Sequence, residues 1–127
     1  MKTFRIFFIL FLISLISCCN DNESEILDYR LIAYNSLSEE EKETISEDWN
    51  NAEIIFGKYK SDVCEHALYS VDRGLMCFLL KDQNIQLEEN QNLTAVIFNT
   101  INDSLLGPII VVIDPVSESA VGSVLRL

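Results

Sequence analysis

Two apolar segments near the C-terminus, residues 93–100 (LTAVIFNT) and 109–113 (IIVVI), decide the predicted fold. The first has the two-residue period of a β-strand, so its side chains alternate between two faces. The second is continuously apolar, which is typical of a strand in the middle of a sheet. Asp114-Pro115 predicts a turn, and residues 120–127 predict a returning strand.

Three earlier segments add to this β region. Residues 53–60 (EIIFGKYK) predict a strand, because they are rich in β-branched and aromatic side chains, and residues 75–80 (LMCFLL) predict a buried strand. Residues 62–71 fit two structures, either a helix that ends near Gly74 or the first strand of a hairpin with residues 75–80. Residues 81–92 are polar and predict a loop.

The segment before residue 53 predicts helices. Apolar residues in 25–35 follow helical spacing. Ser38 and Glu41 form the pattern of a capping box, and we predict a helix over 38–51. Its apolar face would consist of Ile45, Trp49 and Ala52. Helices followed by strands predict an α+β fold, with the N-terminal helices packed on a small antiparallel sheet of about four to five strands.

Length and charge limit the classes of function. The chain has 127 residues, with 9 basic and 20 acidic side chains and a formal net charge of -11. This length allows one domain. Such an acidic excess argues against a nucleic-acid partner, because Lys and Arg must neutralise phosphates in that kind of complex. A hydrophobic content of 49% argues against global disorder.

The first residues predict a signal peptide over residues 1–17. Lys2 and Arg5 precede the unbroken apolar run 6–13 (IFFILFLI). A charged start, a short apolar core and a site with small residues are the features of a secretory signal. The alternative is an uncleaved anchor helix that runs through Ile16, although the apolar core is short for a membrane span.

The end of this segment, Leu15-Ile16-Ser17-Cys18, resembles the lipobox of bacterial lipoproteins. The resemblance implies lipid transfer to the Cys18 sulfur, cleavage before Cys18, and anchoring of the protein to the membrane of the bacterial envelope by acyl chains. Ile16 is larger than the residue usually found there. The next residue is Cys19 and not Asp. A residue other than Asp at this position resembles the sorting signal of lipoproteins that go to the outer membrane. The alternative is an ordinary signal-peptidase site that leaves a secreted protein.

Processing at this point would leave an acidic tether, 18–25, and one small domain, 26–127. Loss of Lys2 and Arg5 leaves 7 basic and 20 acidic residues, a net charge of -13. This charge fits either a protein partner of basic character or solubility alone.

Cysteine usage predicts a disulfide between Cys64 and Cys77, because disulfides persist outside the cytosol. The alternative is two separate buried thiols. Cys19 would be left over at the membrane surface.

Little in the sequence points to chemistry. His66 is the single histidine, and the set Cys64, His66 and Cys77 lacks a fourth zinc ligand and a standard spacing. We therefore predict no catalytic residues, no metal and no cofactor. The leading interpretation is a non-enzymatic binding module. The alternatives are an inhibitor or immunity protein that captures a basic envelope-targeted enzyme and a small hydrolase that uses His66.

The last hairpin carries one further resemblance. Residues 109–114 end in Asp, turn, and return through Gly122, and this pattern resembles the last hairpin of the PepSY family of small secreted modules. The resemblance covers about twenty residues and implies no catalytic residue.

Overall fold

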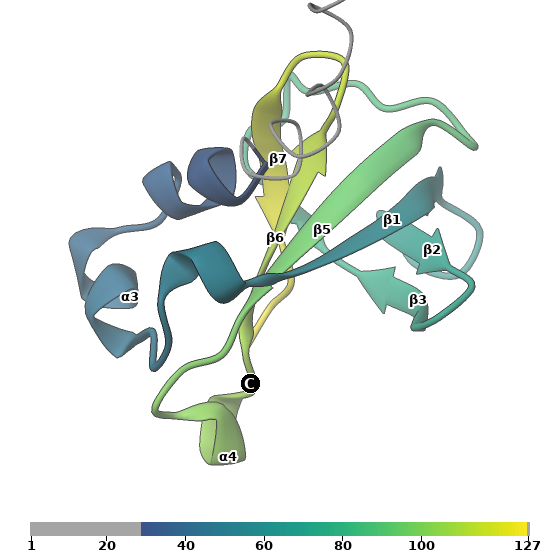
Figure 1. Cartoon of the computed structure of the whole chain (residues 1–127). Helices are drawn as coiled ribbons and strands as arrows, with labels where there is room; N and C mark the ends of the chain where they lie inside the picture. Colours follow the sequence, from purple (N-terminus) through teal and green to yellow (C-terminus); the bar gives the residue numbers. More distant parts are fainter. Residues whose placement is uncertain (1–28, 127) are drawn as a thin grey trace, which may run out of the picture.

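The computed structural model describes residues 29–126 (Figure 1). Residues 29–35 are helical. They are followed by α3 (Glu39–Thr44) and the short 3-10 helix η2 (Trp49–Asn51). The strands are β1 (Glu53–Lys60), β2 (Ala67–Ser70), β3 (Gly74–Cys77), β4 (Leu79–Leu80), β5 (Asn92–Phe98), β6 (Ile109–Asp114) and β7 (Ser119–Ser123). The short helix α4 (Asp103–Leu106) lies between β5 and β6.

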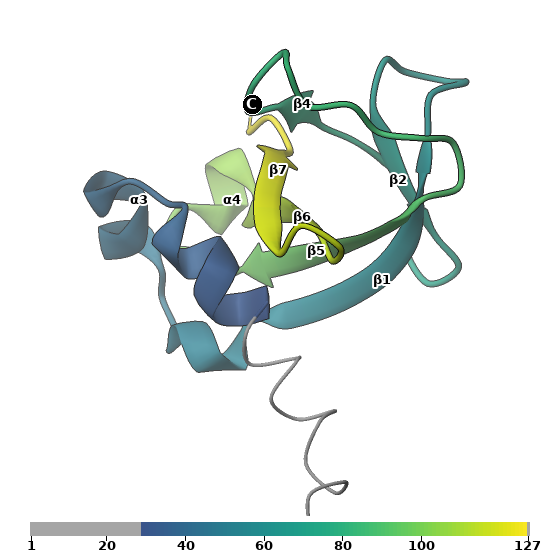
Figure 2. The same ribbon diagram turned by 90° about the horizontal axis from the view of Figure 1, so that it is seen from above.

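All seven strands belong to one antiparallel sheet, in the order β3-β2-β1-β5-β6-β7-β4. The two edge strands, β3 and β4, are separated along the chain by Phe78 alone. The chain therefore passes directly from one edge of the sheet to the other. This connection curls the sheet into a nearly closed barrel, and Figure 2 shows the strands curving around a common interior.

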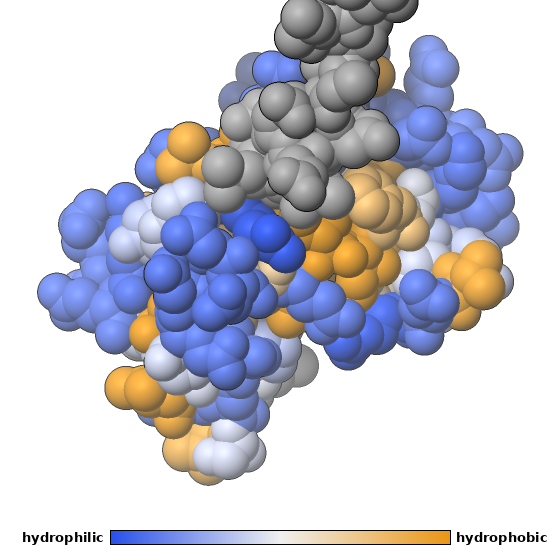
Figure 3. All heavy atoms as spheres, in the orientation of Figure 1, coloured by the Kyte–Doolittle hydropathy of each residue, from blue (hydrophilic) through white to orange (hydrophobic). Residues whose placement is uncertain are grey.

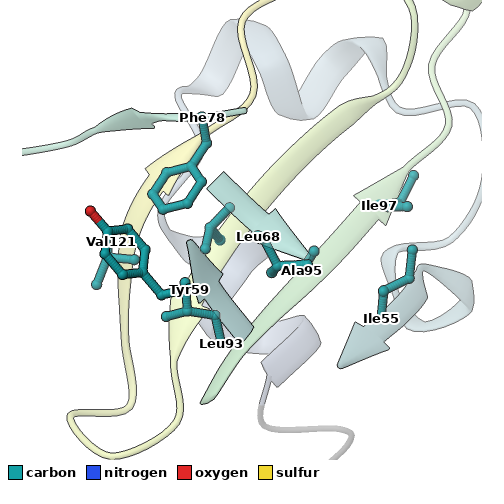
Figure 4. Packing of buried hydrophobic residues seen from close by; sticks show 9 residues of the cluster. Ile55, Tyr59, Leu68, Phe78, Leu93, Ala95, Ile97 and Val121 are labelled. Atoms are coloured by element: carbon teal, nitrogen blue, oxygen red, sulfur yellow. The ribbon is translucent and has the colours of Figure 1, made fainter. Parts of the chain in front are cut away.

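The barrel interior contains one of two hydrophobic cores. Side chains from strands on opposite sides of the barrel point toward one another in it (Figure 4). Its buried members are Ile55, Tyr59, Leu68, Phe78, Leu93, Ala95, Ile97, Val112 and Val121. The Phe78 side chain, from the bend between the edge strands, is 4% exposed and meets the Tyr59 ring edge to face.

The second core lies between the outer face of the sheet and the N-terminal helices, which cover that face in Figures 1 and 2. Ala33 comes from the helical segment 29–35, and Leu37 comes from the bend that follows it. Val96 and Phe98 come from β5. Trp49 packs on this core and stacks on the Tyr34 ring at 5.6 Å. The prediction that helices pack on an antiparallel sheet is confirmed.

Strand β5 contributes to both cores, which explains its sequence. Leu93, Ala95 and Ile97 face the interior, and Val96 and Phe98 face the helices. Because both faces are covered, every residue from 93 to 98 is buried. Apolar area removed from water on both sides makes this strand a main source of hydrophobic stabilisation.

The prediction of four to five strands is wrong, because the sheet has seven. The predicted buried strand 75–80 is two strands, β3 and β4, interrupted at Phe78. It is also not buried throughout, since Leu79 is 57% exposed. Residues 74–80 pair first with β2 and then with β7, and the bend between the two pairings leaves some of their side chains exposed. The apolar sequence of this segment does not show where the bend lies or which side chains it exposes.

The predicted helix over 38–51 is also wrong beyond Thr44. The capping box is present, because Ser38 accepts from the Glu41 amide and the Glu41 carboxylate accepts from the Ser38 amide. The helix ends, however, where Ile45 forms an antiparallel bridge with Thr100. The bridge to Thr100, two residues after the end of β5, takes the place of the next helical turn. The chain then begins a new short helix at Trp49.

Other expectations are confirmed. Strand β1 has the predicted bounds, Glu53–Lys60. The segment 62–71 fitted either a helix or a hairpin, and the structure has the hairpin: residues 67–70 form β2, which pairs with β3 across a turn at 71–73. The hairpin of β6 and β7 is present, although β7 ends at Ser123.

Within residues 29–126, no helix has the length and apolar character needed to span a membrane.

Gly122 lies where β7 pairs with β4, and its lack of a side chain permits the two strands to approach closely. A Cβ atom at this position would lie 2.2 Å from the Leu79 carbonyl oxygen and 2.8 Å from the Phe78 ring. The Leu79 carbonyl is backbone and cannot rotate away. The two strands can pair at this distance only because residue 122 has no side chain.

We expect Gly122→Ala to lower the free energy of unfolding by about 2 kcal/mol, because an extra methyl group in a packed contact forces the backbone apart. Urea denaturation of the purified protein measures this change. Ser123→Ala, at an exposed position in the same strand, is the control and should change stability little. Equal midpoints for Gly122→Ala and the wild type would contradict this account of the closure.

Candidate functional site

An open groove of about 260 Å³ lies at the bend between β3 and β4. It is lined by Cys64, Glu65, His66, Cys77, Phe78, Leu79 and Leu125. Leu79 and Leu125 are each more than half exposed. Exposed leucines in a hollow, rather than scattered singly over the surface, are a feature of binding sites.

A disulfide between Cys64 and Cys77 forms one wall of the groove. Cys64 lies in the loop between β1 and β2, and Cys77 is the last residue of β3. The two Cα atoms are 6.2 Å apart, within the usual range for a disulfide. The predicted bridge is therefore present. It fixes the loop against the edge strand, so the groove has a rigid wall.

His66 lies beside the disulfide and is held by a tyrosine from the barrel interior. Its Nδ1 atom is 2.8 Å from the Tyr59 hydroxyl oxygen, and its Nε2 atom is 3.8 Å from the Glu65 carboxylate. The Tyr59 hydroxyl also lies within hydrogen-bond distance, 3.3 Å, of the Glu65 carbonyl oxygen. The His66 ring packs against Phe78 at 6.0 Å. These contacts fix the imidazole on several sides.

Tyr59 is 6% exposed, and its environment disfavours the phenolate. Burial raises the pKa of Tyr59 above its usual value of 10, and the negative charges of Glu89 and Glu65 raise this pKa further. The hydroxyl therefore stays protonated over the physiological range. It acts as a neutral hydrogen-bonding group that orients His66.

The chemistry available in the groove follows from these contacts. The sulfurs of Cys64 and Cys77 are bonded to each other, so neither is a thiolate that can attack a substrate or ligate zinc. His66 has one ring nitrogen engaged with Tyr59. Over residues 29–126, no three His, Cys, Asp or Glu side chains gather in a way that could hold a metal ion. The groove presents apolar side chains and a fixed imidazole, which suits binding.

The structure brings together three of the residues considered from the sequence, Cys64, His66 and Cys77. The proposed lipidation site Cys18 and its neighbour Cys19 lie outside the described residues. Sequence reasoning missed Tyr59 as the partner of His66. A signal was available, because Tyr59 occupies an inward position of the alternating strand 53–60, but its contact with His66 depends on the hairpin register.

Comparison with known proteins does not assign the chain to a family. No protein-family model matches the sequence. The search of curated proteins finds no significant match, and the search of solved structures finds none either.

The disulfide should contribute substantially to stability. It links residues 13 positions apart, and in the chain-entropy model a loop of this length contributes about 3 kcal/mol by restricting the unfolded chain. We expect the double variant Cys64→Ala/Cys77→Ala to lose about this free energy of unfolding in urea denaturation. Cys19→Ala is the control and should unfold at the wild-type midpoint. Loss of stability in both variants, or in neither, would contradict the assignment.

The raised pKa of Tyr59 predicts an alkaline dependence of stability. In the unfolded chain this tyrosine ionises near pH 10, whereas the folded protein keeps it protonated to higher pH. Its contribution is thus complete below about pH 10 and is lost as the pH rises from there through the folded pKa. Tyr59→Phe should therefore show a smaller loss of unfolding free energy than the wild type between about pH 9 and about pH 11.

Unfolding curves at several alkaline pH values measure this difference. Tyr69→Phe removes an exposed tyrosine hydroxyl from the neighbouring strand and is the matched control for the substitution itself. If Tyr59→Phe and the wild type lost the same free energy over this interval, the Tyr59 hydroxyl would not be in the environment described.

Proposed function

We propose that this chain is a lipid-anchored, non-enzymatic binding module of the bacterial envelope, held at the outer membrane through Cys18. The observation that supports the anchor is the position of Leu15-Ile16-Ser17-Cys18 directly behind a charged start and a short apolar core. A cysteine placed there is available for acylation at the membrane surface, and two or more acyl chains give stable anchoring.

The groove at the β3–β4 bend supports the binding role. Its exposed leucines, Leu79 and Leu125, offer apolar contact area beside a wall fixed by the disulfide. A rigid site loses little conformational entropy when a ligand binds, so more of the contact energy appears as affinity. A tethered domain with such a groove would bind its ligand in the envelope without transforming it.

An inhibitor or immunity protein that captures a basic enzyme is the second proposal, and the charge of the domain favours it. Between residues 29 and 126 there are 16 acidic and 7 basic side chains. Much of the surface visible in Figure 3 is hydrophilic. A field of this sign accelerates encounters with a cationic partner and weakens as salt is added.

Lipidation can be tested directly in a bacterial host fed an alkyne-tagged fatty acid. We expect the wild-type chain to incorporate the tag and to sediment with the membranes, and Cys18→Ala to lose both properties. Cys19→Ala is the matched control, one residue away, and should remain labelled. Undiminished labelling of Cys18→Ala would overturn the proposed anchor.

A further inference from the structure

We propose that the outer edge of β3, beside the groove, binds an extended basic peptide segment by adding it to the sheet as a further strand. This inference rests on the proposed binding function and identifies the kind of ligand that the groove would take. Strand addition uses main-chain hydrogen bonds for affinity and pockets for alternate side chains for selectivity.

The register of the hairpin shows which backbone groups of β3 are available. The Phe78 amide donates to the His66 carbonyl at 2.9 Å, and Met76 lies opposite Leu68. In an antiparallel pair the hydrogen-bonding direction alternates along the strand, so the amides and carbonyls of Leu75 and Cys77 point away from β2. Within residues 29–126, these outward groups have no hydrogen-bond partner.

The strand that would complete the barrel at this edge turns away from it. Strand β7 pairs with β4 at Leu79 and Leu80. The following residues return to the start of β6 instead, where the Val124 amide donates to the Ile110 carbonyl at 3.0 Å. The edge of β3 is therefore left open on the side where Leu125 lines the groove.

The side chains beside the open edge of β3 fit a peptide strand in which every second side chain is apolar. Leu79 and Leu125 form an apolar surface next to the unpaired backbone of Cys77. A peptide paired with β3 would direct every second side chain to this surface. The disulfide fixes Cys77 to the β1–β2 loop, so the edge is held in the extended form before any ligand arrives.

Charge indicates which peptides fit. Glu65 is the charged residue among those lining the groove, and its side chain is 92% exposed. The domain that carries the groove has 16 acidic and 7 basic side chains between residues 29 and 126. A peptide that alternates apolar residues with Lys or Arg would place the apolar side chains against the leucines and its cations in the negative field.

A displayed library of random heptapeptides tests this inference with the full chain in neutral detergent. We expect enrichment of sequences that alternate apolar and basic residues, with binding that weakens as salt increases. The strongest peptide is then made in two N-methylated forms. Methylation of the amides on one edge of the peptide should weaken binding at least tenfold, and methylation of the amides on the other edge should leave it within about twofold, because only one edge can pair with β3.

Protein variants locate the site. Leu75→Pro removes the outward amide and should weaken binding at least tenfold, whereas Leu75→Ala keeps that amide and is the matched control for the side chain. Leu125→Asn should weaken binding, because it removes an apolar side chain from the groove surface without adding charge. Far-ultraviolet circular dichroism and the mass of the disulfide-bonded chain check that each variant folds. The N-methyl comparison needs no variant, so the result does not depend on the folding of Leu75→Pro.

Several outcomes would overturn the inference. These are a library without enrichment, equal binding of both N-methylated forms, unchanged binding to Leu75→Pro, or concentration-dependent dimers that exclude the peptide, which would assign the edge to a second copy of the chain. Cys18→Ala in detergent should bind the peptide as the wild type does. Failure of the anchor and failure of strand addition are therefore separate results.

Discussion

The fold depends on one covalent constraint, which is that residues 74–80 must serve both edges of a single sheet. β3 ends at Cys77 and pairs with β2, while β4 begins at Leu79 and pairs with β7. Phe78 lies between them, with its ring in the barrel interior, and its amide donates a hydrogen bond to the His66 carbonyl. A barrel closed in this way needs a short link and a tight crossing. Gly122 provides the crossing, because it lets the Leu79 carbonyl approach the backbone of β7.

The same closure leaves the outer edge of β3 unpaired, and the groove lies beside this edge. A segment that pairs with β2 in its first half and with β7 in its second cannot satisfy both neighbours along its whole length. Leu79 thus remains exposed at the bend, and Leu125, which follows β7, lines the same groove. Unpaired strand edges are a liability that proteins usually cover or shorten. Here the open edge is short, and the disulfide holds it in place.

How far the sequence predicts this fold depends on whether each element is local. The capping box at Ser38, the bounds of β1 and the β6–β7 hairpin all follow from residues close together in the chain, and each is confirmed. The helix predicted over 38–51 fails because Ile45 pairs with Thr100, a contact between distant segments that helical spacing cannot reveal. The predicted number of strands is too low for a related reason. The apolar sequence of residues 75–80 does not indicate that the chain stops pairing with β2 and begins to pair with β7 at Phe78.

The candidate site shows the same division. The pairing of Cys64 with Cys77 could be predicted from the cysteine count together with the expectation of an oxidising compartment, and the disulfide is present. The role of His66 could not be derived from its neighbours in the sequence. Its partner, the Tyr59 hydroxyl, reaches it only because the hairpin between β1 and β2 places them at the same end of the barrel. With both cysteine sulfurs in a disulfide and the imidazole engaged by a neutral phenol, the most reactive side chains near the groove serve to shape it. What the groove then offers to a molecule that contacts it is unpaired backbone, apolar side chains and charge, which are the features on which the proposed binding function depends.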